Sequence, residues 1–156
     1  MKKLLCGLLP LLLCLSLSAC GGREPAPFDP EADAKTLLET QGAFTGELEE
    51  LELSTACALY GIGEEGVKSC KVYVGNAGVS LEELAIFVLN DADAAQEALT
   101  ALEYHIEDQK EASAGYAGFL REELPKLEGA VLERRGCSVL LAVAADYGPV
   151  NTFLEG

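Results

Sequence analysis

The sequence contains no tryptophan, one methionine and a single histidine, His105. It is also poor in basic residues, with 11 Lys and Arg against 26 Asp and Glu, so the net charge at pH 7 is −15. A surface with this charge repels phosphate backbones and anionic lipid head groups. We therefore do not expect nucleic acid as a partner.

Motifs that would hold a cofactor or a metal are also lacking. The cysteines form no Cys-x-x-Cys pair and His105 is isolated, so no zinc site is predicted. Gly61, Gly63 and Gly66 have the spacing Gly-x-Gly-x-x-Gly, but the segment after them is predicted to be a strand, whereas a dinucleotide site requires a helix there. We expect neither a cofactor nor a metal ion.

Groups that could catalyse a reaction are few. His105 follows Leu102 by three residues, beside the apolar stripe of a predicted helix, where a half-exposed packing role is expected. No Gly-x-Ser-x-Gly motif accompanies it. Paired acids such as Glu82 and Glu83 are predicted to be solvated, because neighbours in a helix or strand point in different directions. No catalytic residue is assigned.

The N-terminus does carry a strong signal. Lys2 and Lys3 precede the 16-residue apolar stretch Leu4 to Ala19, which is shorter than the ~20 residues that cross a bilayer. Leu17-Ser18-Ala19-Cys20 resembles the lipobox of bacterial lipoproteins. The resemblance implies cleavage before Cys20 and attachment of a diacylglyceryl group to its thiol.

Three parts of the chain follow from this interpretation. Residues 1–19 are a lipoprotein signal peptide, residues 20–30 are the lipidated cysteine and a short tether containing three prolines, and residues 31–156 are a single domain. Cleavage leaves 137 residues with a net charge of about −17, since Lys2 and Lys3 depart. Two acyl chains suffice for stable attachment. We expect a location on the extracytoplasmic face of the cell membrane.

Three cysteines remain besides Cys20 once the signal peptide is removed: Cys57, Cys70 and Cys137. An odd number allows at most one internal disulfide, and a bond between Cys57 and Cys70 stays open. Cys137 alternates in phase with three apolar residues, which predicts a buried structural position in a strand (Val139, Leu141 and Val143).

The apolar periodicity predicts an α+β fold, a small antiparallel sheet covered by helices. Residues 84–89 are ambiguous. Ser80-Leu81-Glu82-Glu83 matches a helix capping box, but a strand is favoured because the next helix has its own start signal at Asn90. The other predicted elements are helices at 31–42, 54–61, 90–112, 116–124 (interrupted by Pro125) and 149–154, a surface segment at 48–53, and strands at 67–75, 130–134 and 137–145.

From about Leu48 to its end, the chain resembles bacterial lipoproteins that carry domain of unknown function 4358. The matching features are Leu59-Tyr60-Gly61, Val72-Tyr73-Val74, Glu83-Leu84-Ala85-Ile86-Phe87 ahead of Asp91, Gln109, Tyr116 and the hairpin around Gly136. Departures are Ala117, where proline often follows the tyrosine, and Cys137-Ser138, where a polar-aromatic pair is more usual. The resemblance implies export, anchoring and a common fold, and it implies no catalytic residue.

Two functions remain in view. The first is a non-catalytic module of the cell envelope that binds a protein, a peptide or a wall component. The alternative is a small thiol-dependent or hydrolytic envelope enzyme, for which Cys70, between Lys68 and Lys71, is the best nucleophile.

Overall fold

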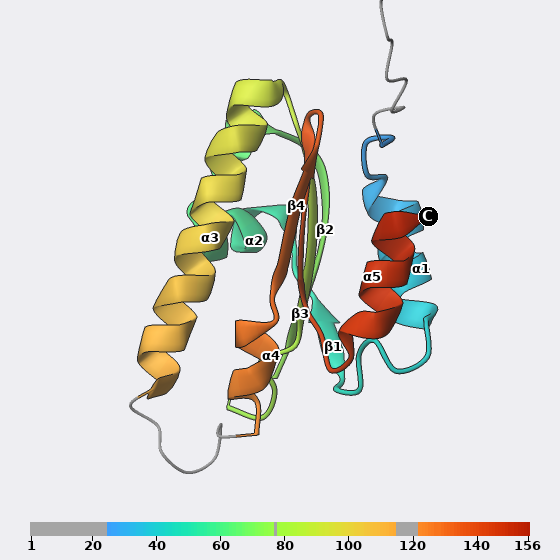
Figure 1. Ribbon diagram of the computed structural model, residues 1–156. Helices are drawn as coiled ribbons and strands as arrows, with labels where there is room; N and C mark the ends of the chain where they lie inside the picture. The colour runs from blue at the N-terminus through green and yellow to red at the C-terminus, as the bar shows by residue number, and fades with distance from the viewer. Residues whose placement is uncertain (1–24, 77, 115–121) are drawn as a thin grey trace, which may run out of the picture.

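The computed structural model describes residues 25–76, 78–114 and 122–156. They form an α+β domain built on a five-stranded antiparallel sheet with strand order β1-β2-β3-β5-β4. Helices α2, α3 and α4 cover one face of this sheet, and α1 and α5 cover the other (Figure 1). The predicted fold class, an antiparallel sheet covered by helices, is confirmed.

The central strands explain the long apolar runs in the sequence. In β3 six of seven residues are buried, and in β5 all six are. A strand that is covered on both faces carries apolar residues continuously instead of alternating them with polar ones. The strand predicted at 84–89 is therefore confirmed over the helix alternative. The strands are β1 Leu48–Glu50, β2 Val67–Gly75, β3 Glu83–Leu89, β4 Val131–Arg135 and β5 Ser138–Val143.

The helices follow the predicted order with shifted ends. Asp146 caps the last helix by accepting a hydrogen bond from the Gly148 N–H at 2.8 Å, so this helix begins at Tyr147 rather than Pro149. The helix predicted at 54–61 begins one residue earlier, at Leu53, with Glu52 in the N-cap position. The helices are α1 Pro30–Glu39, α2 Leu53–Tyr60, α3 Ala92–Ala114, α4 Leu124–Glu128, α5 Tyr147–Glu155 and the 3-10 turn η1 Glu64–Gly66.

Pro125 lies at the start of a helix instead of interrupting one. It lies in the first turn of α4, where its missing N–H costs no hydrogen bond. Most of the helix predicted at 116–124 lies outside the described residues, and Glu122 and Glu123 form a turn.

Close packing reaches back to Phe28, which precedes the predicted start of the domain at residue 31. Phe28 is 3% exposed, its N–H donates to the Ser138 Oγ at 2.8 Å, and the Arg135 guanidinium lies 4.4 Å from its ring centre. A fully buried phenylalanine contributes about 1.5–3 kcal/mol. The prolines around Phe28 indicated a tether, and a single aromatic residue carries no periodicity that would contradict them.

Cys137 is not buried in a strand, contrary to prediction. It lies in the turn between β4 and β5 and is partly exposed, while β5 begins at Ser138. Its carbonyl accepts the Leu89 N–H at 2.8 Å, so its backbone still joins the sheet. Gly136, with φ of +58°, turns the chain here, so β5 begins one residue later than the pattern indicated. Cys57 and Cys70 are free thiols, so the disulfide left open is not formed.

The two ends of the sheet differ in what lies beside them (Figure 1). At one end, the turn between β4 and β5 lies next to Pro25 and Pro27. These two prolines line a pocket together with Gly136 of the turn. The connection from β2 to β3 and helix α4 lie at the opposite end (Figure 1). Within the described ranges, no helix is both long and apolar enough to cross a membrane.

Candidate functional site

Two consecutive carboxylates, Glu82 and Glu83, are buried at the beginning of β3. They are 1% and 3% exposed, so the prediction that they are solvated is wrong. Successive residues of an extended chain point to opposite sides. The two side chains accordingly enter two separate polar networks, one around Lys126 and one around His105.

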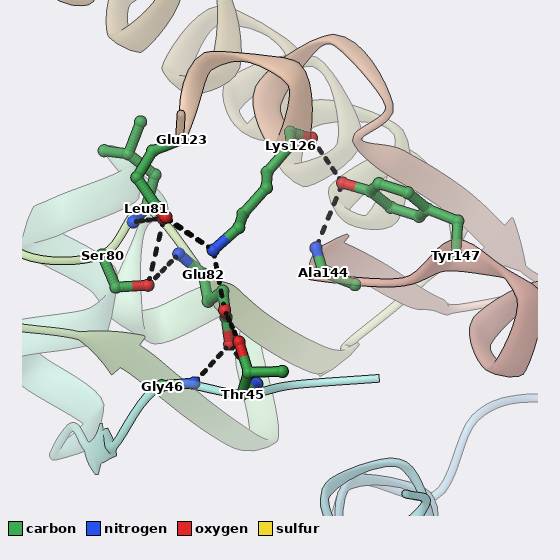
Figure 2. A network of polar contacts seen from close by, with 9 residues as sticks. All are labelled: Thr45, Gly46, Ser80, Leu81, Glu82, Glu123, Lys126, Ala144 and Tyr147. Atoms are coloured by element: carbon green, nitrogen blue, oxygen red, sulfur yellow. Dashed lines mark hydrogen bonds and ion pairs between the residues drawn. The ribbon is translucent and has the colours of Figure 1, made fainter. Parts of the chain in front are cut away.

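The Glu82 carboxylate is satisfied by four donors (Figure 2). It accepts the Thr45 N–H and hydroxyl, each at 2.8 Å, the Gly46 N–H at 3.0 Å, and the Lys126 ammonium at 2.8 Å. Burial alone would raise the pKa of Glu82, but the hydrogen bonds from Lys126, Gly46 and Thr45 outweigh burial and hold this pKa below 4.5. Glu82 is therefore an ionised, charge-compensated group.

Lys126 extends this network to the loop before β3. Its ammonium also lies 2.8 Å from both oxygens of Glu123. The Glu123 carboxylate in turn accepts the Leu81 N–H at 3.0 Å and the Ser80 hydroxyl at 3.4 Å (Figure 2). Tyr147 donates its hydroxyl to the Lys126 carbonyl, which fixes helix α4 from the other side. The network thereby holds the 80–82 segment against α4.

The Glu83 carboxylate is surrounded by different partners. The Tyr60 hydroxyl donates to its Oε1 at 2.9 Å, and His105 Nε2 lies 3.2 Å from both oxygens. The Gln109 amide nitrogen lies 3.5 Å from Oε2 and 2.6 Å from His105 Nε2. Among the described residues, no Lys or Arg nitrogen lies within 4 Å of Glu83. Glu83 thus has hydrogen-bond donors but no permanent cation beside it.

Tyr60 is held rigidly in this arrangement. Its ring makes edge-to-face contacts with Phe87, at a centroid distance of 5.8 Å, and with His105, at 4.8 Å. Burial, followed by the nearby Glu83 charge, raises the pKa of Tyr60 well above its usual 10. Tyr60 therefore stays a neutral donor at physiological pH.

A cleft of about 310 Å³ opens beside Glu83. Most of its lining residues are apolar or have small side chains, and Leu59, which is 43% exposed, is one of them. The lining residues are Leu59, Val74, Gly75, Gly78, Ser80, Leu81, Glu82, Glu83 and Gln109. The cleft combines apolar walls with a carboxylate and an amide, the composition typical of ligand sites.

His105 occupies a different environment from the one predicted. The sequence indicated a half-exposed packing residue, whereas its side chain is 11% exposed and contacts Glu83, Tyr60 and Gln109. The periodicity placed it correctly beside the apolar stripe of its helix but could not reveal the partners that β3 and α2 bring to it.

The cysteines do not converge on the cleft. Burial raises the pKa of the Cys57 thiol, and burial followed by Cys57 raises that of Cys70. The thiolate is the reactive form, so both sites disfavour nucleophilic attack. Cys20, the predicted lipid attachment point, lies outside the described residues, and within the described ranges no three metal-binding side chains cluster.

Residues 41–144 match the family described as domain of unknown function (DUF4358). The chain belongs to this family. The comparisons with curated proteins and with solved structures found no match. Three of the sequence features that resemble DUF4358 proteins, Tyr60, Glu83 and Gln109, meet at the Glu83 carboxylate, and two of them, Glu83 and Gln109, line the cleft. Tyr116, another such feature, lies outside the described residues. The resemblance was thus the one sequence signal that could have located the cleft.

Replacing Tyr60 by phenylalanine is expected to lower the free energy of unfolding by about 1.5–3 kcal/mol, the usual range for a hydrogen bond to a charged group. The change removes only the hydroxyl that donates to Glu83. Urea unfolding measures the loss. Tyr104→Phe is the matched control, because Tyr104 is 71% exposed. Equal stability of the two variants would contradict a structural role for this hydrogen bond.

Proposed function

We propose that this DUF4358 protein is a lipid-anchored, extracytoplasmic binding module of the cell envelope. In this proposal Cys20 carries the lipid, residues 1–19 are removed, and the cleft beside Glu83 receives a protein or a wall component. The observation that carries the proposal is that the cleft is lined by residues of the β2–β3 connection, whereas Pro25 shares a pocket with the β4–β5 turn. These two connections lie at opposite ends of the sheet (Figure 1).

The strand register supports this orientation. Glu83 pairs with Val143 at one end of β3, and Val88 pairs with Ser138 at the other, next to the turn that Pro25 and Pro27 approach. A strand of seven residues spans roughly 20 Å at about 3.3 Å per residue. The five residue-to-residue steps from Cys20 to Pro25 reach at most roughly 17 Å. A lipid on Cys20 would hold the β4–β5 turn near the bilayer and leave the cleft facing away.

The non-catalytic character is part of the same proposal. The cleft lining includes Ser80 as its sole hydroxyl nucleophile among the described residues, and this hydroxyl is engaged with Glu82 N–H and Glu123. The alternative, a thiol-dependent enzyme, would use Cys70, which lines a different pocket with Glu50 and Glu52. Carboxylates beside a thiol disfavour its ionised form.

Site-specific photocrosslinking in intact cells tests the proposal. A benzophenone side chain at Val79, which is 60% exposed next to the cleft-lining residues Gly78 and Ser80, should capture a discrete partner. The same group at Lys35, exposed on α1 across the sheet, is the control and should not capture it. Adding Leu59→Asp should abolish the product, because it places a charge on the cleft wall. A product that persists with Leu59→Asp would show that the cleft is not the binding site.

A further inference from the structure

Glu82 and Glu83 differ in one respect that bears on the ligand. Both are almost completely buried, but Glu82 has the Lys126 ammonium at 2.8 Å and Glu83 has no permanent cation within 4 Å among the described residues. A buried carboxylate is costly unless an opposite charge or several hydrogen bonds compensate it. Among the described residues, Glu83 has Tyr60, His105 and Gln109 as partners and no Lys or Arg, so a cation that reaches it adds a permanent opposite charge.

The Glu83 carboxylate retains capacity to accept another donor. Two oxygens together offer about four acceptor positions. The Tyr60 hydroxyl donates to Oε1 at 2.9 Å, His105 Nε2 lies 3.2 Å from both oxygens, and the Gln109 contact to Oε2 is long, at 3.5 Å. Both Glu83 and Gln109 line the cleft. A donor entering the cleft would therefore meet Oε2, whose contacts with His105 and Gln109, at 3.2 and 3.5 Å, are longer than the contact of Oε1 with Tyr60.

The size and polarity of the cleft restrict the cation. An ammonium is a compact charge that can bind one oxygen, whereas a guanidinium binds best when both carboxylate oxygens are free. A group that passes the apolar residues Leu59, Val74 and Leu81 must also carry an apolar stem. The lysine side chain has both, a terminal ammonium on four methylene groups.

We propose that the cleft binds a lysine side chain of a partner protein, with its ammonium against Glu83 and its stem against Leu59, Val74 and Leu81. This inference rests on the proposed binding function of the cleft. The net charge of the whole chain, −15, favours the approach of such a basic partner. The occupant of the cleft is thus a basic segment of a protein rather than an acidic or purely apolar one.

NMR titration of the full mature chain in phosphatidylcholine nanodiscs provides the test. The probe is lysine blocked at both ends (Nα-acetyl-lysine N-methylamide), compared with norleucine blocked in the same way. Blocked lysine should shift the amide signals of Gly75, Leu81 and Glu83 and bind at least tenfold more tightly than blocked norleucine. Alanine N-methylamide, which has a free α-amine without a long stem, should bind as weakly as norleucine.

Two pairs of variants separate the contributions. Glu83→Gln should remove the preference for lysine, whereas Glu49→Gln, which removes the same charge from an exposed position paired with Val74, should keep it. If Glu83→Gln does not fold, Leu59→Lys replaces it, since an internal ammonium on the wall should weaken blocked lysine at least tenfold, and Leu59→Met should not.

The outcomes distinguish the ligand class from the function. The lysine inference would be overturned if blocked norleucine or alanine N-methylamide bound as tightly as blocked lysine. A crosslink at Val79 would in that case still support a binding cleft. Cleft signals that respond to none of the probes would also overturn the lysine inference. By contrast, a Val79 crosslink that also forms at Lys35, or that persists with Leu59→Asp, would reject the proposed function itself.

Discussion

Replacement of Cys20 by alanine is expected to abolish incorporation of a fatty-acid analogue into the protein completely. The lipobox Leu17-Ser18-Ala19-Cys20 provides one thiol for the diacylglyceryl group, and alanine has no nucleophile to take its place. Cleavage before residue 20 should be lost as well, since the lipoprotein signal peptidase acts on the lipidated precursor. The apolar stretch from Leu4 to Ala19 would then remain attached.

Mass spectrometry of the mature N-terminus measures this directly. The wild-type chain should begin at Cys20 and carry at least two acyl chains. Cys14→Ala is the matched control, because Cys14 belongs to the segment that is removed and its loss should leave labelling intact. Membrane fractionation is a weaker measurement, since an uncleaved Leu4–Ala19 stretch also partitions into lipid. An unmodified Cys20, or a mature chain that starts elsewhere, would reject the anchoring proposal.

Replacement of Lys126 by methionine is expected to lower the free energy of unfolding by roughly 3 kcal/mol, the low end of the range for breaking a buried ion pair. Methionine preserves the length and apolar stem of the side chain but leaves Glu82, which is 1% exposed, without a counter-charge. It also leaves Glu123 without its ammonium partner. Lys35→Met, at an exposed i,i+4 pair with Glu39, should change stability by less than about 0.5 kcal/mol.

The loss caused by Lys126→Met should depend on pH in a defined direction. Burial opposes ionisation of Glu82 and Glu123, but the hydrogen bonds from Lys126 and from their other donors together outweigh it and lower both pKa values below the usual 4.5. The stabilisation that they give is therefore present above pH 4.5 and disappears as the pH falls through the lowered values. Glu123 and Glu82 raise the Lys126 pKa above 10.5 despite burial, so that contribution is lost only above this pH. Urea unfolding of the wild type and of Lys126→Met at pH 7 and in acid should show that the difference between their free energies of unfolding becomes smaller in acid. A difference in the free energy of unfolding that does not change with pH would contradict the ion-pair assignment.

The elements were predictable where one physical signal dominated. The run from Leu84 to Leu89 identified a doubly covered strand, and the stepped apolar residues of residues 90–112 identified the long helix. Cys137 was misplaced because the alternating apolar pattern of β5 extends back by one residue into the turn that Gly136 forms. Phe28 was missed because its anchor, the Ser138 hydroxyl, lies 110 residues away in sequence.

The cleft was largely unpredictable from residue patterns. Two consecutive glutamates ordinarily indicate a solvated surface, and nothing local shows that Lys126 and Tyr60 come from distant helices to meet them. The buried pair depends on tertiary contacts separated by 44 and 23 residues. The resemblance to DUF4358 proteins marked Tyr60, Glu83 and Gln109 but gave no indication that they are neighbours.

The outer strands of the sheet have a consequence for proteins confined to one surface. β1 is three residues long and carries the exposed Glu49 and Glu50, and the opposite outer strand, β4, carries Glu133 and the exposed Arg134. Short, charged outer strands resist pairing with the strands of another molecule. Copies tethered to the same membrane, as we propose, would meet far more often than copies diffusing freely in three dimensions. The charges on β1 would then keep such crowded neighbours from joining their sheets into aggregates.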